Sequence, residues 1–151
     1  MKPSSDEDIL FSETTSLIGA MLAILFSVLG SVGNLFTIVA LVISKLRGHP
    51  TTLCVISLAA SDLVFSSFNL PLLAQRFLHR GCHFMCLDQQ LCQYFPLSFF
   101  GNIGVSLYMM VLISLQRLHG VFYGHLLPDV FSSRNVMIMI TVVWIISFGS
   151  M

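Results

Sequence analysis

The sequence predicts an all-α membrane protein whose helices cross a lipid bilayer, and two observations lead to this fold class. The first is composition: of 151 residues, 56% are hydrophobic and only 9% are charged, whereas soluble domains carry roughly 25% charged residues. The second is that the apolar residues gather in four long blocks. Because a spanning helix needs roughly 20 mostly apolar residues, we expect helices at about 17–43, 51–76, 89–122 and 134–151.

The lipid environment excludes most other architectures. The bilayer core offers no water to the backbone, so only helices and closed barrels span it. The four blocks lack the period-2 alternation of barrel strands, which leaves helices. The formal net charge is zero, with no basic stripe, so the partner that we expect is the bilayer and not a nucleic acid.

Residues 1–16 are polar and acidic, and they predict an extracellular tail rather than a signal peptide. A signal peptide begins with basic residues and has an apolar core of about 7–15 residues. This start instead carries Asp6, Glu7 and Asp8 and precedes a longer apolar block, which we interpret as an uncleaved first span. Counted over the N-terminal tail and the stretches 44–50, 76–88 and 117–135, the Lys and Arg residues number four on one side of the membrane and three on the other. Because cytoplasmic loops carry more of them, this count favours an N-terminus outside the cell.

Asp62 is a lone carboxylate inside an apolar block, where an ionisable group is expensive unless polar groups or water surround it. Asp62 lies 11 residues after Thr51, and Ser106 lies 11 residues before Arg117. At the helical rise, both fall roughly 16 Å from the same membrane face. Asn102 shares the stripe of Ser106, because residues i and i+4 lie on one face of a helix.

A carboxylate, an amide and a hydroxyl at one depth permit two interpretations. Such an oxygen-rich site could hold a small cation with waters, or a proton. The alternative is a hydrogen-bond network that only joins neighbouring helices. The spacing leaves both interpretations open.

Five motifs, in order along the chain, resemble those of rhodopsin-like (class A) G-protein-coupled receptors, and the resemblance covers about residues 30–151. They are Gly33-Asn34, Leu58-Ala59-Ala60-Ser61-Asp62, Cys92 at the start of the third helix, Ser114-Leu115-Gln116-Arg117-Leu118 near its end, and Trp144. The stretches around Cys92 and Asn102 are similar to a narrower group, the invertebrate receptors of the moody and trapped-in-endoderm type.

The resemblance implies a seven-helix receptor bundle in the plasma membrane, with the N-terminus extracellular. Residues 17–151 would supply its first three to four transmembrane helices, as a truncated N-terminal portion. We therefore expect the chain to be a fragment, a truncated gene model or a short isoform. Cys92 would form the family's disulfide with a partner beyond the chain end.

The resemblance also implies roles for polar residues. In the family, the positions of Asp62, Asn102 and Ser106 form a sodium pocket that favours the inactive state, which strengthens the cation interpretation. We expect no other cofactor.

Arg117, with Gln116 and Leu118 beside it, stands where the family engages a heterotrimeric G protein. Gln116 is neutral where the family usually has an acidic residue that restrains the arginine. We therefore expect the basal activity to be higher than in family members that keep the acidic residue.

The resemblance does not identify the extracellular ligand, but it constrains the chemistry of that ligand. Phe99 stands where amine receptors carry an aspartate, so we do not expect an amine. Phe95 and Phe99 are candidates to line a ligand pocket, and helix packing or lipid contact is the alternative for both.

Two further possibilities are weighed against simpler ones. The cluster His79, Cys82, His83 and Cys86 could suggest zinc, but in an oxidising outer loop a disulfide or free thiols are favoured. No catalytic motif occurs, so an enzyme is not expected. The alternative function is a stand-alone small membrane protein that acts as an assembly partner or dominant-negative of full-length receptors.

Overall fold

The computed structural model describes residues 12–78, 89–123 and 130–149, and all regular structure in these ranges is helical. The elements are α1 (Glu13–Ile43), α2 (Pro50–Val64), the π-helix η1 (Phe65–Asn69), α3 (Leu70–Leu78), α4 (Gln89–Tyr123) and α5 (Ser133–Gly149). The predicted all-α membrane fold is confirmed.

Three of the described helical segments are long and apolar enough to cross a membrane: Glu13–Ile43, Pro50–Leu78 and Tyr94–Phe122. The second of these is continuous through α2, η1 and α3. Helix α5 is apolar but shorter, with 17 residues.

Helix α1 begins at Glu13, four residues earlier than the expected start at residue 17. The reason is a cap at Ser12, whose hydroxyl accepts a hydrogen bond from the Thr15 N–H, with acidic Glu13 in the first turn. Residues 13–16 of the expected tail are therefore helical, and buried Ser16 donates its hydroxyl to the Phe77 carbonyl. At the next helix, Pro50 occupies the first turn of α2, where its missing N–H needs no partner.

A π turn interrupts the second span just before Pro71. Proline has no N–H and its ring clashes with the carbonyl four residues earlier, so an α-helix cannot continue through it undisturbed. Here the Leu70 N–H donates to the Phe65 carbonyl, five residues back. The Ser66 hydroxyl donates to the Asp62 carbonyl at 2.7 Å and the Ser67 hydroxyl donates to the Leu63 carbonyl at 2.6 Å. The wider turn thus keeps the backbone hydrogen-bonded around the proline.

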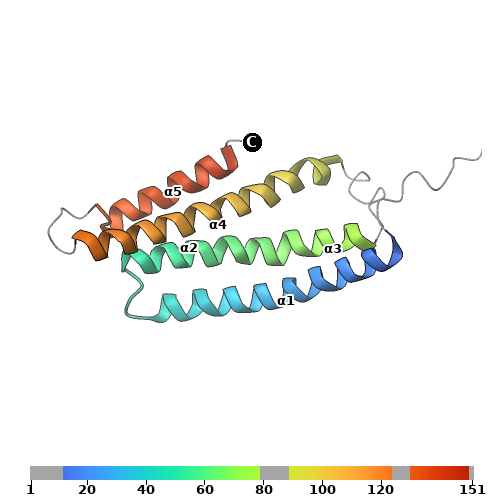
Figure 1. Cartoon of the computed structure of the whole chain (residues 1–151), viewed down its shortest axis with the longest axis horizontal. Helices are drawn as coiled ribbons and strands as arrows, with labels where there is room; N and C mark the ends of the chain where they lie inside the picture. The colour runs from blue at the N-terminus through green and yellow to red at the C-terminus, as the bar shows by residue number, and fades with distance from the viewer. Residues whose placement is uncertain (1–11, 79–88, 124–129, 150–151) are drawn as a thin grey trace, which may run out of the picture.

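The helices run antiparallel, and the span α2–α3 lies between α1 and α4 (Figure 1). Helix α2 also contacts α5. The end of α1, the start of α2, the end of α4 and the start of α5 meet at one end of the bundle (Figure 1). There the Ser133 hydroxyl donates to the Gly48 carbonyl at 2.6 Å. This end, called the basic end below, carries Lys45, Arg47, Arg117 and Arg134, all exposed.

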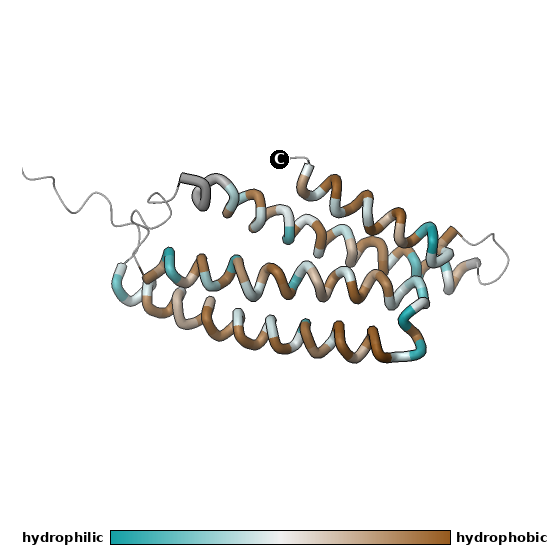
Figure 2. Tube along the Cα trace, turned by 180° about the vertical axis from the view of Figure 1, so that it is seen from behind, coloured by the Kyte–Doolittle hydropathy of each residue, from teal (hydrophilic) through white to brown (hydrophobic). Residues whose placement is uncertain are grey.

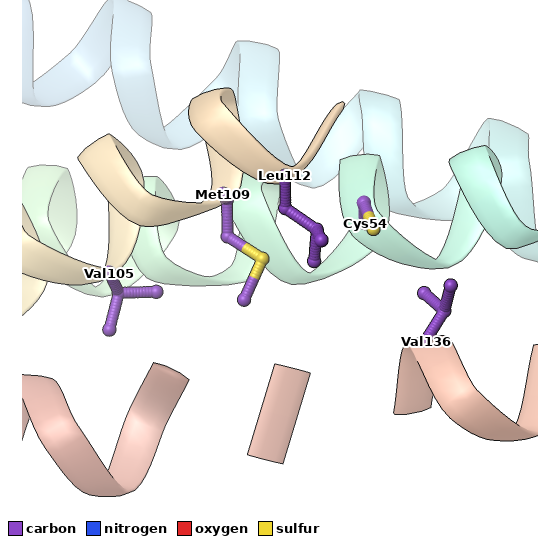
Figure 3. Packing of buried hydrophobic residues seen from close by; sticks show 5 residues of the cluster. All are labelled: Cys54, Val105, Met109, Leu112 and Val136. Atoms are coloured by element: carbon purple, nitrogen blue, oxygen red, sulfur yellow. The ribbon is translucent and has the colours of Figure 1, made fainter. Parts of the chain in front are cut away.

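The buried hydrophobic cluster lies between α2, α4 and α5 (Figure 3). It consists of Cys54, Val105, Met109, Leu112 and Val136. Many larger apolar side chains point outward instead, and Figure 2 shows hydrophobic residues along the length of α1. This distribution suits a protein whose outer solvent is lipid, because apolar side chains gain nothing by leaving it.

Small residues allow the helices to approach closely. A Cβ atom added at Gly30 would lie 2.8 Å from the Ser66 Cβ, where α1 crosses η1. On α4, a Cβ at Gly101 would lie 2.6 Å from the Phe148 ring of α5. That ring cannot move freely, because it stacks on Trp144 with the ring centroids 5.8 Å apart.

We predict that Gly101→Ala destabilises the protein and that Gly120→Ala on the same helix does not. Nothing lies within 4 Å of a Cβ added at Gly120, so alanine there should add only its helix preference. The added methyl at position 101 must displace the Phe148 ring, and overpacking of this kind costs about 1–3 kcal/mol. Thermal unfolding in detergent compares the two variants, and equal melting temperatures would contradict the close contact.

Candidate functional site

A partly open cavity of about 190 Å³ lies between the second span and α4. Its lining consists of Asp62, Phe65, Asn102, Ile103, Ser106 and Leu107. The three polar residues that the sequence placed at one membrane depth therefore line one cavity. The first two lining residues come from the second span and the others from α4.

Asp62 and Ser106 are joined directly across the helix interface. The Ser106 hydroxyl donates to Asp62 Oδ1 at 2.7 Å. A carboxylate has two oxygens with about four acceptor positions, and this hydrogen bond uses one of the oxygens. Asp62 is only half-buried and lines the cavity, so its remaining hydrogen-bond acceptor positions are open to the cavity.

Asn102 is bonded to other neighbours than Asp62. It is 1% exposed, and its side-chain oxygen accepts from the Ser61 hydroxyl at 3.2 Å. Its side-chain nitrogen donates to the Ser98 carbonyl at 2.8 Å. The amide is thus held in one orientation beside the cavity, and Ser61 is a site residue that the sequence analysis did not single out. Its position next to Asp62, in a helix that faces α4, was the available signal.

The arrangement has the chemistry of a hard-cation site. The polar lining offers carboxylate, hydroxyl and amide groups, and oxygen donors suit small hard cations. The same hydrogen bonds also join α2 to α4, as the packing interpretation expected. The two interpretations are compatible, because the pairs at Asp62 and at Asn102 leave part of the carboxylate available.

An aromatic cluster adjoins the cavity. The Phe65 ring of η1 lies 5.2 Å from the Phe99 ring, measured between centroids. Phe99 in turn lies 5.5 Å from both Phe95 and Phe100. Phe95 is buried and Phe99 half-buried, so the two candidate ligand-pocket residues belong to one packed group. Phe65, which the sequence analysis did not single out, connects this group to the cavity.

At the basic end, Gln116 and Arg117 point in different directions. Gln116 is 8% exposed, and its side-chain nitrogen donates to the Cys54 sulfur at 3.4 Å. Arg117 and Leu118 are exposed. Gln116 therefore contributes to the contact between α4 and α2, whereas Arg117 is open to a partner.

The remaining predicted residues lie apart from the cavity. The Trp144 indole N–H donates to the Ser57 hydroxyl at 3.0 Å, which joins α5 to α2. Asn34 is half-buried in α1 and is not part of the cavity lining. The side chain of Cys92 and the cluster at 79–86 lie outside the described residues, so the Cys92 disulfide, and the disulfide or free thiols favoured over zinc at 79–86, stay predictions.

Comparison with known proteins assigns the chain to one family. The family model of the 7 transmembrane receptor (rhodopsin family) matches residues 33–151. The chain is 36% identical over 148 residues to Protein trapped in endoderm-1 of Drosophila melanogaster, which covers 97% of this chain and 37% of that protein. It is 30% identical over 139 residues to G-protein coupled receptor moody of the same species, covering 92% and 20%. It is 32% identical over 135 residues to human Lysophosphatidic acid receptor 6, covering 89% and 38%.

The chain belongs to the rhodopsin family of seven-transmembrane receptors. Within this family it is similar to the trapped-in-endoderm and moody receptors, as the motifs around Cys92 and Asn102 indicated. It is a multi-pass membrane protein. It spans well under half the length of the relatives named above.

We predict that the hydrogen bond between Trp144 and Ser57 stabilises the position of α5. Trp144→Phe and Ser57→Ala each remove it, and membrane hydrogen bonds are worth about 0.6 kcal/mol on average. The double variant should lose less stability than the sum of the two single variants, because the bond can be lost only once. Thermal unfolding of the three variants measures this. Strictly additive losses would show that the contact contributes nothing.

Proposed function

We propose that this chain forms the N-terminal part of a receptor that senses an extracellular ligand and signals through a heterotrimeric G protein. The observation that carries the proposal is the exposed Arg117 at the basic end of α4, the helix that also contributes residues to the aromatic cluster and to the cavity lining. The rhodopsin-family match supports it, and one relative is named a G-protein coupled receptor.

The proposed orientation places the basic end in the cytoplasm and the N-terminus outside the cell, at the plasma membrane. Lys45, Arg47, Arg117 and Arg134 lie together at that end. In the described ranges the acidic residues are Glu13 and Asp62, and neither of them lies at the basic end. Cytoplasmic membrane faces favour such an excess of Lys and Arg.

The proposed ligand is not an amine. Phe95 and Phe99 offer apolar rings, and Phe99 stands where amine receptors carry the aspartate that pairs with an ammonium group. A ligand with a substantial apolar part would fit these rings. The name of Lysophosphatidic acid receptor 6 connects that relative with a lipid of this kind.

The proposed allosteric ligand is a sodium ion bound by Asp62, Ser106 and Asn102. Support comes from the cavity that these residues line and from the carboxylate oxygen left available beside Ser106. Binding of the ion would favour the inactive bundle, because a ligand stabilises the state that binds it better.

We predict that Arg117→Ala abolishes G-protein activation by the complete receptor that contains this chain. Nucleotide exchange on the G protein is measured in membranes with matched surface expression. Arg134→Ala, which removes an exposed cation at the same end, is the control and should keep most of the activity. If Arg117→Ala were as active as the control, the proposed coupling surface would be wrong. If the unmodified receptor itself activated no G protein, the alternative role as an assembly partner of other receptors would be favoured.

We predict that sodium lowers basal G-protein activation and that Asp62→Asn removes this effect. Sodium chloride is replaced by choline chloride at constant ionic strength, so that general screening stays equal. Ser106→Ala should raise the sodium concentration that gives half of the effect about tenfold, in line with the loss of a hydrogen bond to a charged group. Ser114→Ala is the control, because the Ser114 hydroxyl bonds to the Met110 carbonyl of its own helix. A sodium response that survives in Asp62→Asn would rule out the proposed site.

A further inference from the structure

Phe65 belongs to two features at once. Its side chain lines the cavity together with Asp62 and Ser106. Its ring also lies 5.2 Å from Phe99 in the aromatic cluster. Phe99 does not line the cavity. Among the described residues that line the cavity, Phe65 is the single aromatic one, and it therefore provides a direct route of contact between the cluster and the cavity.

The backbone around Phe65 is fixed on both sides. Its N–H donates to the carbonyls of Ser61 and Asp62. Its carbonyl accepts the Leu70 N–H across the π turn. The ring is thereby anchored one turn beyond Asp62, and π turns inside α-helices occur often at functional sites. A displacement of the ring must come from rotation of the side chain or from a change in the π turn.

Packed side chains transmit displacement because they leave no free space between them. If the Phe99 ring moves, the Phe65 ring must move with it or lose its contact. The cavity wall next to the Asp62–Ser106 pair then changes, since Phe65 is part of that wall.

We propose that Phe65 is the positioning residue through which the outer aromatic cluster acts on the cation cavity. Occupancy of the cluster and occupancy of the cavity then influence each other through this ring, and the coupling is reciprocal by thermodynamic necessity. The inference rests on the cation site proposed above. It adds a specific residue that carries the coupling.

The test is a double-mutant cycle that needs no extracellular ligand. The complete receptor that contains this chain is purified, and its melting temperature is measured against sodium chloride at constant ionic strength. A bound cation stabilises the folded protein by RT ln(1 + [Na⁺]/Kd), so the rise of the melting temperature with sodium gives each variant a dissociation constant for sodium. We expect Phe99→Ala to shift this constant at least about threefold, the scale of coupling between residues in contact. In a Phe65→Ala background the same change should shift it by less than about 1.5-fold.

Two further backgrounds separate coupling from damage. Phe65→Leu keeps an apolar side chain without the ring contact, so it should lose the Phe99 effect as Phe65→Ala does. Phe68→Ala is the matched control: Phe68 lies in the same π turn but is exposed, so the Phe99 effect should persist at about threefold.

The outcomes distinguish this inference from the proposed cation site. If the unmodified receptor shows no sodium stabilisation, or if Asp62→Asn retains it, the cation site fails and the inference fails with it. If sodium acts through Asp62 but Phe99→Ala has no effect, or has the same effect in every background, only the role of Phe65 is overturned.

Discussion

The absence of water in the bilayer core is the constraint on which the rest of this structure depends. Every backbone polar group there needs a partner inside the protein. Some side-chain hydroxyl groups on the helices are bonded locally: Thr37 and Thr141 donate to carbonyls four residues back in their own helices. Ser27 instead donates across the interface to the Ser66 carbonyl, at 2.7 Å. Hydrogen bonds within one helix do not constrain its position relative to other helices, whereas hydrogen bonds between helices fix where the helices meet.

Asp62 is the group that this constraint affects most, because a carboxylate cannot satisfy itself within its own helix. Ser106 supplies one hydrogen bond, and the cavity borders the rest of the carboxylate. Asn102 is held nearby by Ser61 and Ser98. The result is a cavity beside a carboxylate and a hydroxyl whose orientations are already fixed, which supports the proposed cation site.

Proline connects this site to the outer half of the bundle. Pro71 prevents a regular α-helix, and the π turn that accommodates it positions Phe65 on the cavity and Ser66 against α1. The hydroxyl groups of Ser66 and Ser67 keep the turn hydrogen-bonded. One backbone irregularity therefore supports helix packing, the cavity wall and the aromatic cluster.

The sequence by itself determined the fold class, the four helical segments and the common depth of Asp62, Asn102 and Ser106. The length of an apolar block and the rise of a helix depend only on residues that are close together along the chain, so both can be read from one sequence. The same reasoning missed the earlier start of α1, although the cap at Ser12 and Glu13 was visible in the sequence. It also did not foresee the π turn that precedes Pro71.

Only the tertiary structure decided which polar groups pair. It joined Asp62 to Ser106, turned Asn102 towards Ser61, and directed Gln116 to Cys54 while Arg117 remained exposed. Depth along a helix follows from counting residues, but rotation about the helix axis and the choice of partner depend on how neighbouring helices pack. Phe65 entered the site for the same reason: it lies one turn after Asp62 in the second span, and only the packing against α4 shows that its side chain lines the cavity.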